Sequence, residues 1–66
     1  MSESIFTLYN DDKFEKIRYY LQEHGYITLN DIAHFDFDEL MFVPGVSEHL
    51  ISEAKRIFFF VVYPHL

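Results

Sequence analysis

The chain has 66 residues, of which 11 are acidic and five are Lys or Arg, so its formal net charge at neutral pH is −6. Half of the residues are apolar, a fifth are aromatic and none is cysteine. This length fits one small domain with a dense aromatic core, and the composition excludes disulfides and thiolate metal sites. The longest apolar run, residues 57–63, is far too short to cross a bilayer. We therefore expect no membrane association, and a cytoplasmic protein or a fragment of a longer one.

The basic residues occupy two short stretches of the chain. They are Lys13, Lys16, Arg18, Lys55 and Arg56. No Lys or Arg occurs in residues 19–54, and phosphate binding depends on cations that replace condensed counterions. The two basic stretches either adjoin in the fold as a small positive patch or form ordinary ion pairs with acidic neighbours.

The N-terminal residues 1–9 are predicted to form an arm that lies on the domain, or a short strand. A helix is predicted over residues 10–25, with Asn10 as its N-cap and Gly25 just after its end. Its predicted inward face follows helical spacing and comprises Phe14, Ile17, Leu21 and His24, with Tyr20 beside them.

Two shorter helices are predicted over residues 28–35 and 36–43. Thr28 with Asp31 three residues later resembles a capping box, in which two side chains bind two backbone N–H groups. Asp36 is typical of the next N-cap. The expected inward residues of these two helices are Leu29, Ile32, Ala33, Leu40, Met41 and Val43.

The last helix is predicted over residues 47–62, after a turn at Pro44 and Gly45 and with Ser47 as its N-cap. An apolar stripe at helical spacing predicts an inward face of Leu50, Ile51, Ala54, Ile57, Phe58 and Val61. Phe59 and Phe60 lie outside this stripe, so the end of the helix is apolar nearly all round. A helix of this kind is usually buried on all sides.

The segments LQEHGYITLNDI and FDFDELMFVPGVSEHLISEAKRI resemble the helix-hairpin-helix group over residues 14–60, and in particular the C-terminal domain of the bacterial RNA polymerase alpha subunit. The resemblance implies an all-α fold: a small bundle of four to five short helices with a helix-hairpin-helix-like element. It also implies a role in a DNA transaction such as transcription, replication or repair. In this group the hairpin glycines present backbone N–H groups to a phosphate at a helix N-terminus, where the helix dipole attracts anions.

The sequence departs from this group where the phosphate would bind. Gly45 is present, but Ser47 replaces the second glycine, and Glu48 and His49 stand where basic residues would follow. A carboxylate in the first helical turn interacts with the helix dipole itself and repels phosphate. We therefore expect at most weak, non-specific contact with DNA phosphates.

The candidate phosphate-binding residues are the backbone donors and cations nearest this turn: Gly45, Val46, Ser47, His49, Lys55 and Arg56. His49 could replace the usual lysine as a pH-dependent contact. The alternative interpretation is a plain helix-to-helix turn with a serine cap and a half-exposed histidine.

The aromatic residues at the C-terminal end favour a different function, protein–protein interaction or self-association, through Phe59, Phe60 and Tyr63. Exposed apolar patches mark interaction sites. Three explanations of this apolar surface are open. The N-terminal arm, residues 5–9, lies across it; the helix forms a homodimer or docks on a partner protein; or the next segment of a longer parent protein covers it.

Motifs for catalysis are absent from the sequence, so we expect a non-enzymatic module without a cofactor. No phosphate-binding loop, nucleophile elbow or zinc-protease motif occurs. Asp36, Asp38 and Glu39 cluster, but without the glycine and the oxygen-rich spacing of a calcium loop. The four histidines are scattered, without pairs at i, i+3 or i+4, and predict no zinc site.

Overall fold

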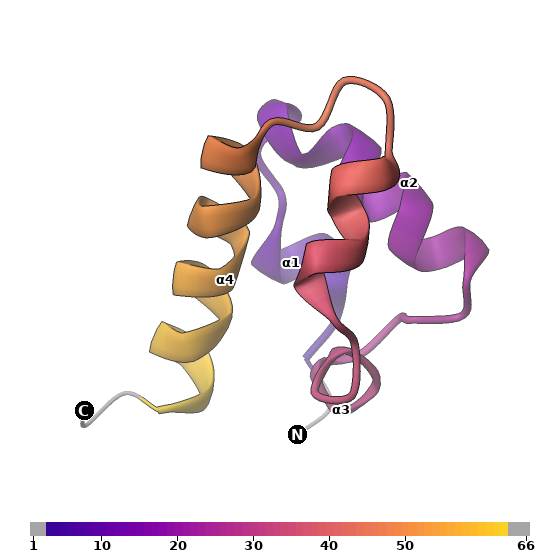
Figure 1. The fold of residues 1–66 in the computed structure, drawn as a ribbon. Helices are drawn as coiled ribbons and strands as arrows, with labels where there is room; N and C mark the ends of the chain where they lie inside the picture. Colours follow the sequence, from indigo (N-terminus) through magenta and orange to yellow (C-terminus); the bar gives the residue numbers. More distant parts are fainter. Residues whose placement is uncertain (1–2, 64–66) are drawn as a thin grey trace.

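The fold is an assembly of short helices, described for residues 3–63 in a computed structural model (Figure 1). The elements in chain order are α1 (Ile5–Leu8), the 3-10 helix η1 (Asp12–Phe14), α2 (Glu15–Glu23), α3 (Leu29–Ile32), the 3-10 helix η2 (Phe37–Phe42) and α4 (Glu48–Val62). Because η1 leads directly into α2, the described residues form five helical segments. They contain no strand, only one isolated bridge between Ser4 and Thr28. The predicted all-α class is confirmed.

The helix boundaries differ from the predicted ones, and side-chain caps account for most of the differences. Asp11 rather than Asn10 caps the segment of η1 and α2, because the Asp11 side chain accepts a hydrogen bond from the N–H of Lys13. The predicted helix over 28–35 is one turn, α3, and the predicted helix over 36–43 is a 3-10 helix. The caps at Thr28 and Asp36 follow each other so closely that only the single turn of α3 fits between them.

The core draws side chains from every helical segment. Its largest fully buried members are Ile5, Tyr9, Ile17, Leu21, Leu29, Ile32 and Leu40. Phe14, Phe35, Phe37, Ile51 and Ala54 complete it. Every buried side-chain nitrogen or oxygen in residues 3–63 has a hydrogen-bond partner.

Three residues predicted to face inward are exposed: His24, Ala33 and Met41. His24 and Ala33 are the C-caps of α2 and α3, where the chain leaves the helix and the inward direction is lost. Met41 is 57% exposed because η2 has three residues per turn. That period aligns Phe37 with Leu40 on the core side and turns Met41 outward.

The N-terminal segment is part of the core. The N–H of Ile5 donates to the carbonyl of Ile27 at 2.9 Å, and the N–H of Leu29 donates to the carbonyl of Glu3 at 2.9 Å. The hydroxyl of Tyr9, a fully buried residue, donates to the carbonyl of Ala54 at 2.8 Å. The segment therefore ties the start of the chain to the middle of α4. Residues 1 and 2 of the predicted arm lie outside the described residues.

The predicted capping box at α3 is confirmed. The Asp31 carboxylate accepts from the N–H groups of Thr28 at 3.0 Å and Ile27 at 2.9 Å, and the N–H of Asp31 donates to the Thr28 hydroxyl. These backbone N–H groups, that of Thr28 first, hold the pKa of Asp31 below its ordinary value.

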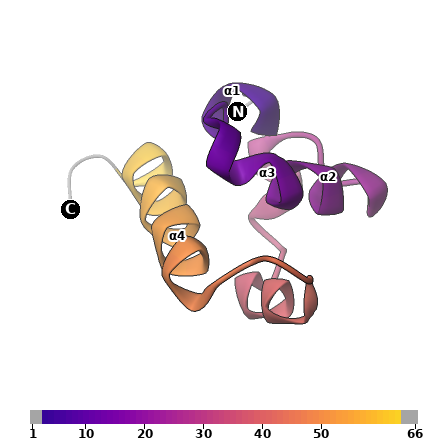
Figure 2. The ribbon, with the colours of Figure 1, turned by 90° about the horizontal axis from the view of Figure 1, so that it is seen from above.

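Helix α4 forms one edge of the molecule. It lies beside η2, and residues 43–47, called the hairpin below, join the two at one end (Figure 1). Seen from above, the other helices lie on one side of α4 (Figure 2). Its Ile51 and Ala54 are buried, whereas Phe59, Phe60 and Tyr63 stay exposed. None of the described helices combines the length and the apolar character that a membrane crossing needs.

The Tyr9 hydroxyl supplies a tertiary hydrogen bond that a Phe side chain cannot make. We expect Tyr9→Phe to lower the free energy of unfolding by about 1 kcal/mol, because the variant leaves the Ala54 carbonyl without this donor. Urea unfolding at neutral pH measures the change. Tyr19→Phe is the matched control, since Tyr19 is 65% exposed and should be neutral; an equal loss in both variants would contradict this role of Tyr9.

The Asp31 capping box should make stability depend on pH in the acid range. A lowered folded pKa contributes stability above the unfolded pKa, roughly 4, and this contribution is lost as the pH falls through the lower folded value. We expect Asp31→Ala to unfold at lower temperature near neutral pH and to lose less stability on acidification than the wild type. Thermal melts across this range test it, with Asn30→Ala on the same turn retaining the wild-type acid profile.

Candidate functional site

The hairpin is a tight turn that ends in a capped helix. Gly45 has φ +87°, a left-handed conformation that L side chains rarely adopt. The N–H of Val46 donates to the carbonyl of Val43 at 3.2 Å, and the hydroxyl of Ser47 accepts from the N–H of Leu50 at 3.1 Å. The turn places Gly45 and Ser47 directly before the first residue of α4, Glu48.

The hairpin keeps two of the three predicted backbone donors available. Within residues 3–63, the N–H groups of Gly45 and Ser47 have no hydrogen-bond acceptor. The N–H of Val46 is engaged inside the turn and cannot also donate to a ligand without breaking it. The available donors lie at the positive end of α4, a helix of 15 residues.

Lys16 of α2 supplies the cation at this turn, a residue that the sequence did not link to the hairpin. A Cβ atom built on Gly45 would overlap the Lys16 ammonium nitrogen and lie 3.1 Å from its Cδ and Cε atoms. The ammonium group therefore lies against the Gly45 backbone. Lys16 makes no ion pair in the described part of the chain.

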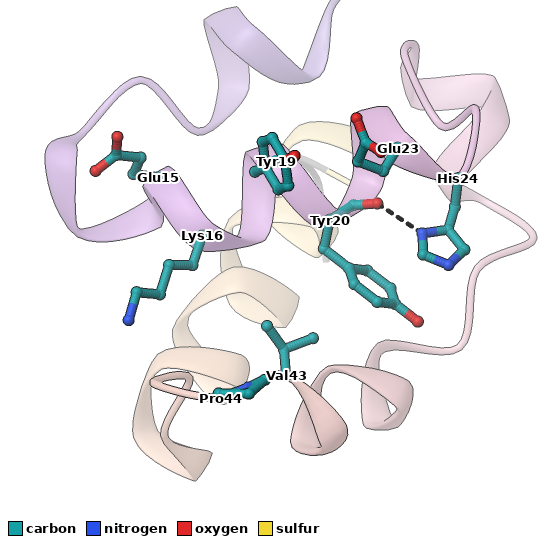
Figure 3. A pocket seen from close by; sticks show the side chains of 8 residues that line it. All are labelled: Glu15, Lys16, Tyr19, Tyr20, Glu23, His24, Val43 and Pro44. Atoms are coloured by element: carbon teal, nitrogen blue, oxygen red, sulfur yellow. Dashed lines mark hydrogen bonds between the residues drawn. The ribbon is translucent and has the colours of Figure 1, made fainter.

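A groove of about 630 Å³ lies between α2 and the hairpin. Figure 3 shows Lys16 and Tyr20 directed from α2 toward Val43 and Pro44. The lining residues are Glu15, Lys16, Tyr19, Tyr20, Glu23, His24, Val43 and Pro44. The walls are mostly apolar and aromatic, but the lining also includes two carboxylates, Glu15 and Glu23. Both repel an anion near Lys16.

Tyr20, one of the two tyrosines that line this groove, contacts both Glu39 and His24. Its hydroxyl donates to the Glu39 carboxylate at 2.6 Å, and that hydrogen bond raises the pKa of Tyr20. Its ring stacks on His24 with a centroid distance of 4.2 Å. Tyr20 therefore links α2 to η2 at one wall of the groove.

Most of the other cationic side chains bind carboxylates or backbone carbonyls within the fold. Lys13 pairs with Glu53 of α4, which lowers the pKa of Glu53 and raises that of Lys13. Lys55 pairs with Asp38 at 2.9 Å. Arg18 donates to the carbonyls of Tyr9 and Asp11. These three basic side chains thus form contacts within the fold rather than one shared positive patch.

Lys55 and Arg56, predicted to assist the hairpin, lie away from it. Arg56 is nine residues beyond Ser47, which places it roughly 13 Å further along the axis of α4. Lys55 is bound to Asp38, at the start of η2. His49 stands in the first turn of α4 with a side chain that is 88% exposed, 3.8 Å from the Glu53 carboxylate.

The three candidate protein-interaction residues form one surface, called the outer aromatic face below: Phe59, Phe60 and Tyr63. They are 54%, 68% and 48% exposed, and the rings of Phe59 and Tyr63 stack with centroids 5.7 Å apart. With Arg56 they line a hollow of about 210 Å³. The N-terminal segment reaches α4 at Ala54 and leaves this surface uncovered.

The acidic cluster on η2 has a structural use for each carboxylate. Asp36 caps η2, Asp38 pairs with Lys55 and Glu39 accepts from Tyr20. Among residues 3–63, no group of three or more His, Asp or Glu side chains is placed to hold a metal ion.

Comparisons of the chain with protein-family models, with curated proteins and with solved structures found no match.

Gly25 and Gly45 both have positive φ, but only Gly45 contacts Lys16. Substitution of each glycine therefore distinguishes the effect of backbone strain from the effect of the contact with Lys16. Gly25 has φ +83° and open space around it, whereas Gly45 faces Lys16. We expect Gly25→Ala and Gly45→Ala each to lower the free energy of unfolding by about 1–2 kcal/mol, the cost of a left-handed L residue. Denaturant unfolding measures both.

Only the change at Gly45 should also displace the Lys16 side chain. We therefore expect the Hε resonances of Lys16 to shift in Gly45→Ala and to remain unchanged in Gly25→Ala. Unchanged Lys16 resonances in both variants would contradict the contact between the ammonium group and the hairpin.

Proposed function

We propose that the chain is a non-enzymatic binding module of a DNA-transaction protein, with a helix-hairpin-helix-like element that makes weak, non-specific contact with DNA phosphates. The observation that carries this proposal is the Lys16 ammonium group beside Gly45, at the N-terminus of α4. A phosphate there would meet one cation and the N–H groups of Gly45 and Ser47.

The physical support comes from the combination of these groups. A helix N-terminus with unpaired N–H groups favours anions, and a nearby ammonium group adds Coulomb attraction of about 1–4 kcal/mol at contact distance, depending on the local dielectric. Lys16 can turn toward a phosphate without breaking an ion pair in residues 3–63. The resemblance of residues 14–60 to the helix-hairpin-helix group favours the same ligand.

The same geometry limits the affinity. Glu48 is the first residue of α4, and Glu15 precedes Lys16 on the rim of the groove, so both carboxylates oppose an incoming phosphate. A net charge of −6 adds long-range repulsion. One phosphate neutralised by Lys16 implies a shallow salt dependence, with a slope of log K against log salt of about −1.

Removal of the Lys16 charge should weaken DNA binding more than removal of a paired lysine. We expect Lys16→Gln to lower the low-salt affinity for a short duplex several-fold, and Lys13→Gln to change it much less. The two variants alter the net charge equally, but Lys13 is bound to Glu53. Fluorescence anisotropy at low salt, repeated at several salt concentrations, measures both; equal losses would mean that only the overall charge matters.

Reversal of the charge at Glu48 should strengthen the same contact. We expect Glu48→Lys to raise the low-salt affinity by about tenfold or more, since it removes a repulsion and adds an attraction, each of about 1 kcal/mol in water. The gain should shrink when Lys16 is also replaced by Gln, because the two cations would share one phosphate. An unchanged affinity in Glu48→Lys would show that DNA does not contact the hairpin.

A further inference from the structure

The exposed side of α4 changes character along its length. At 100° per residue, its exposed side chains fall on one third of the helix circumference. The first half of this side is polar, with Glu48, His49 and Ser52, and its second half is the outer aromatic face with Arg56 at its border. Glu53 is the last acidic residue of α4, so no carboxylate follows Arg56 within the helix.

We infer that the outer aromatic face binds a second copy of this chain, with the two α4 helices packed antiparallel over residues 56–63. This inference is independent of the proposed DNA contact, because it uses the opposite end of α4. The other helices lie on the inner side of α4, and its outer side carries no described element (Figures 1 and 2).

The order of side chains on this face is self-complementary. In an antiparallel pair related by a two-fold axis, a contact from residue i to residue j is repeated from j to i. An axis between Phe59 and Phe60 places Phe59 opposite Phe60 of the other copy. It also places Arg56 opposite Tyr63 twice, where a guanidinium can stack on a tyrosine ring.

The hollow on this face supports the same packing. It is lined by Arg56, Phe59, Phe60 and Tyr63, and its volume of about 210 Å³ admits one aromatic ring of the second copy. Aromatic side chains bury roughly 150–250 Å² each, so the three exposed fractions leave roughly 300–400 Å² per chain to be covered. Two such faces bury roughly 600–800 Å² before Arg56 is counted, which is below the area of about 1,200 Å² typical of stable interfaces, so the dimer is expected to be weak.

The charge distribution allows this pairing and predicts how dimerisation depends on salt. Each copy carries a net charge of −6, which opposes association at long range. The overlapping residues 56–63 contain one Arg and no acid, and the acidic first halves of the two α4 helices point in opposite directions. Added salt screens the repulsion, so dimerisation should strengthen with salt, whereas contact with DNA should weaken.

Sedimentation equilibrium of the whole chain over a range of concentrations tests the dimer. We expect a monomer–dimer equilibrium whose dissociation constant falls several-fold between ~20 mM and about 0.5 M salt. Phe60→Ala should raise the dissociation constant at least tenfold and leave the circular dichroism spectrum and melting temperature unchanged. Phe42→Ala is the matched control, because Phe42 is 86% exposed but lies outside this face, and it should associate as the wild type does.

A pair of charge substitutions tests the register. Arg56→Glu alone should weaken the dimer, since it replaces the cation opposite Tyr63. The double variant Arg56→Glu with Tyr63→Lys should restore association, because each new carboxylate then faces a new ammonium group of the other copy. This recovery is specific to the antiparallel arrangement about the Phe59–Phe60 axis.

Two results would overturn the inference. A chain that stays monomeric at millimolar concentration at both salt levels would assign the outer aromatic face to a different partner. Association that Phe42→Ala weakens as much as Phe60→Ala, or that the double charge variant fails to recover, would place the interface elsewhere or in another register.

Discussion

The hydrogen bond from Tyr9 to the Ala54 carbonyl joins the start of the chain to the middle of α4. It lies in the core, and Ile51 and Ala54 are the only buried residues of α4 within the described part of the chain. The core therefore holds α4 at its middle, and the two ends of the helix have different surroundings. The N-terminal end meets Lys16 of α2 through the hairpin, and the C-terminal end leaves three aromatic rings exposed. Both proposed surfaces follow from this attachment.

Pairing of charges within the fold decides which basic residues can bind a ligand. Lys13 and Lys55 are bound to carboxylates, and Arg18 is bound to backbone carbonyls. Lys16 and Arg56 make neither an ion pair nor a hydrogen bond to a backbone carbonyl with their side chains within residues 3–63. Lys16 lies beside the N-terminal end of α4, and Arg56 lies in the second half of this helix. A small acidic domain can therefore carry one site for an anion and one for an aromatic partner.

Local sequence signals predicted the features that depend on neighbouring residues. The cap at Ser47, the capping box of Thr28 with Asp31 and the turn at Gly45 each arise within a few residues. The placement of Lys16 against Gly45 could not be predicted, because it depends on how α2 packs against the hairpin. Met41 was wrongly assigned to the core, since an α-helical period was applied to a segment that forms a 3-10 helix.

The most direct test of the hairpin as a phosphate site is a titration of the labelled protein with a short DNA duplex at low salt, followed by backbone amide shifts. The proposal predicts shifts at Gly45, Ser47 and the residues around Lys16 that become smaller as salt is added, with Phe59 to Tyr63 unaffected. An absence of shifts at several-fold excess of DNA, or shifts confined to Phe59 to Tyr63, would contradict it.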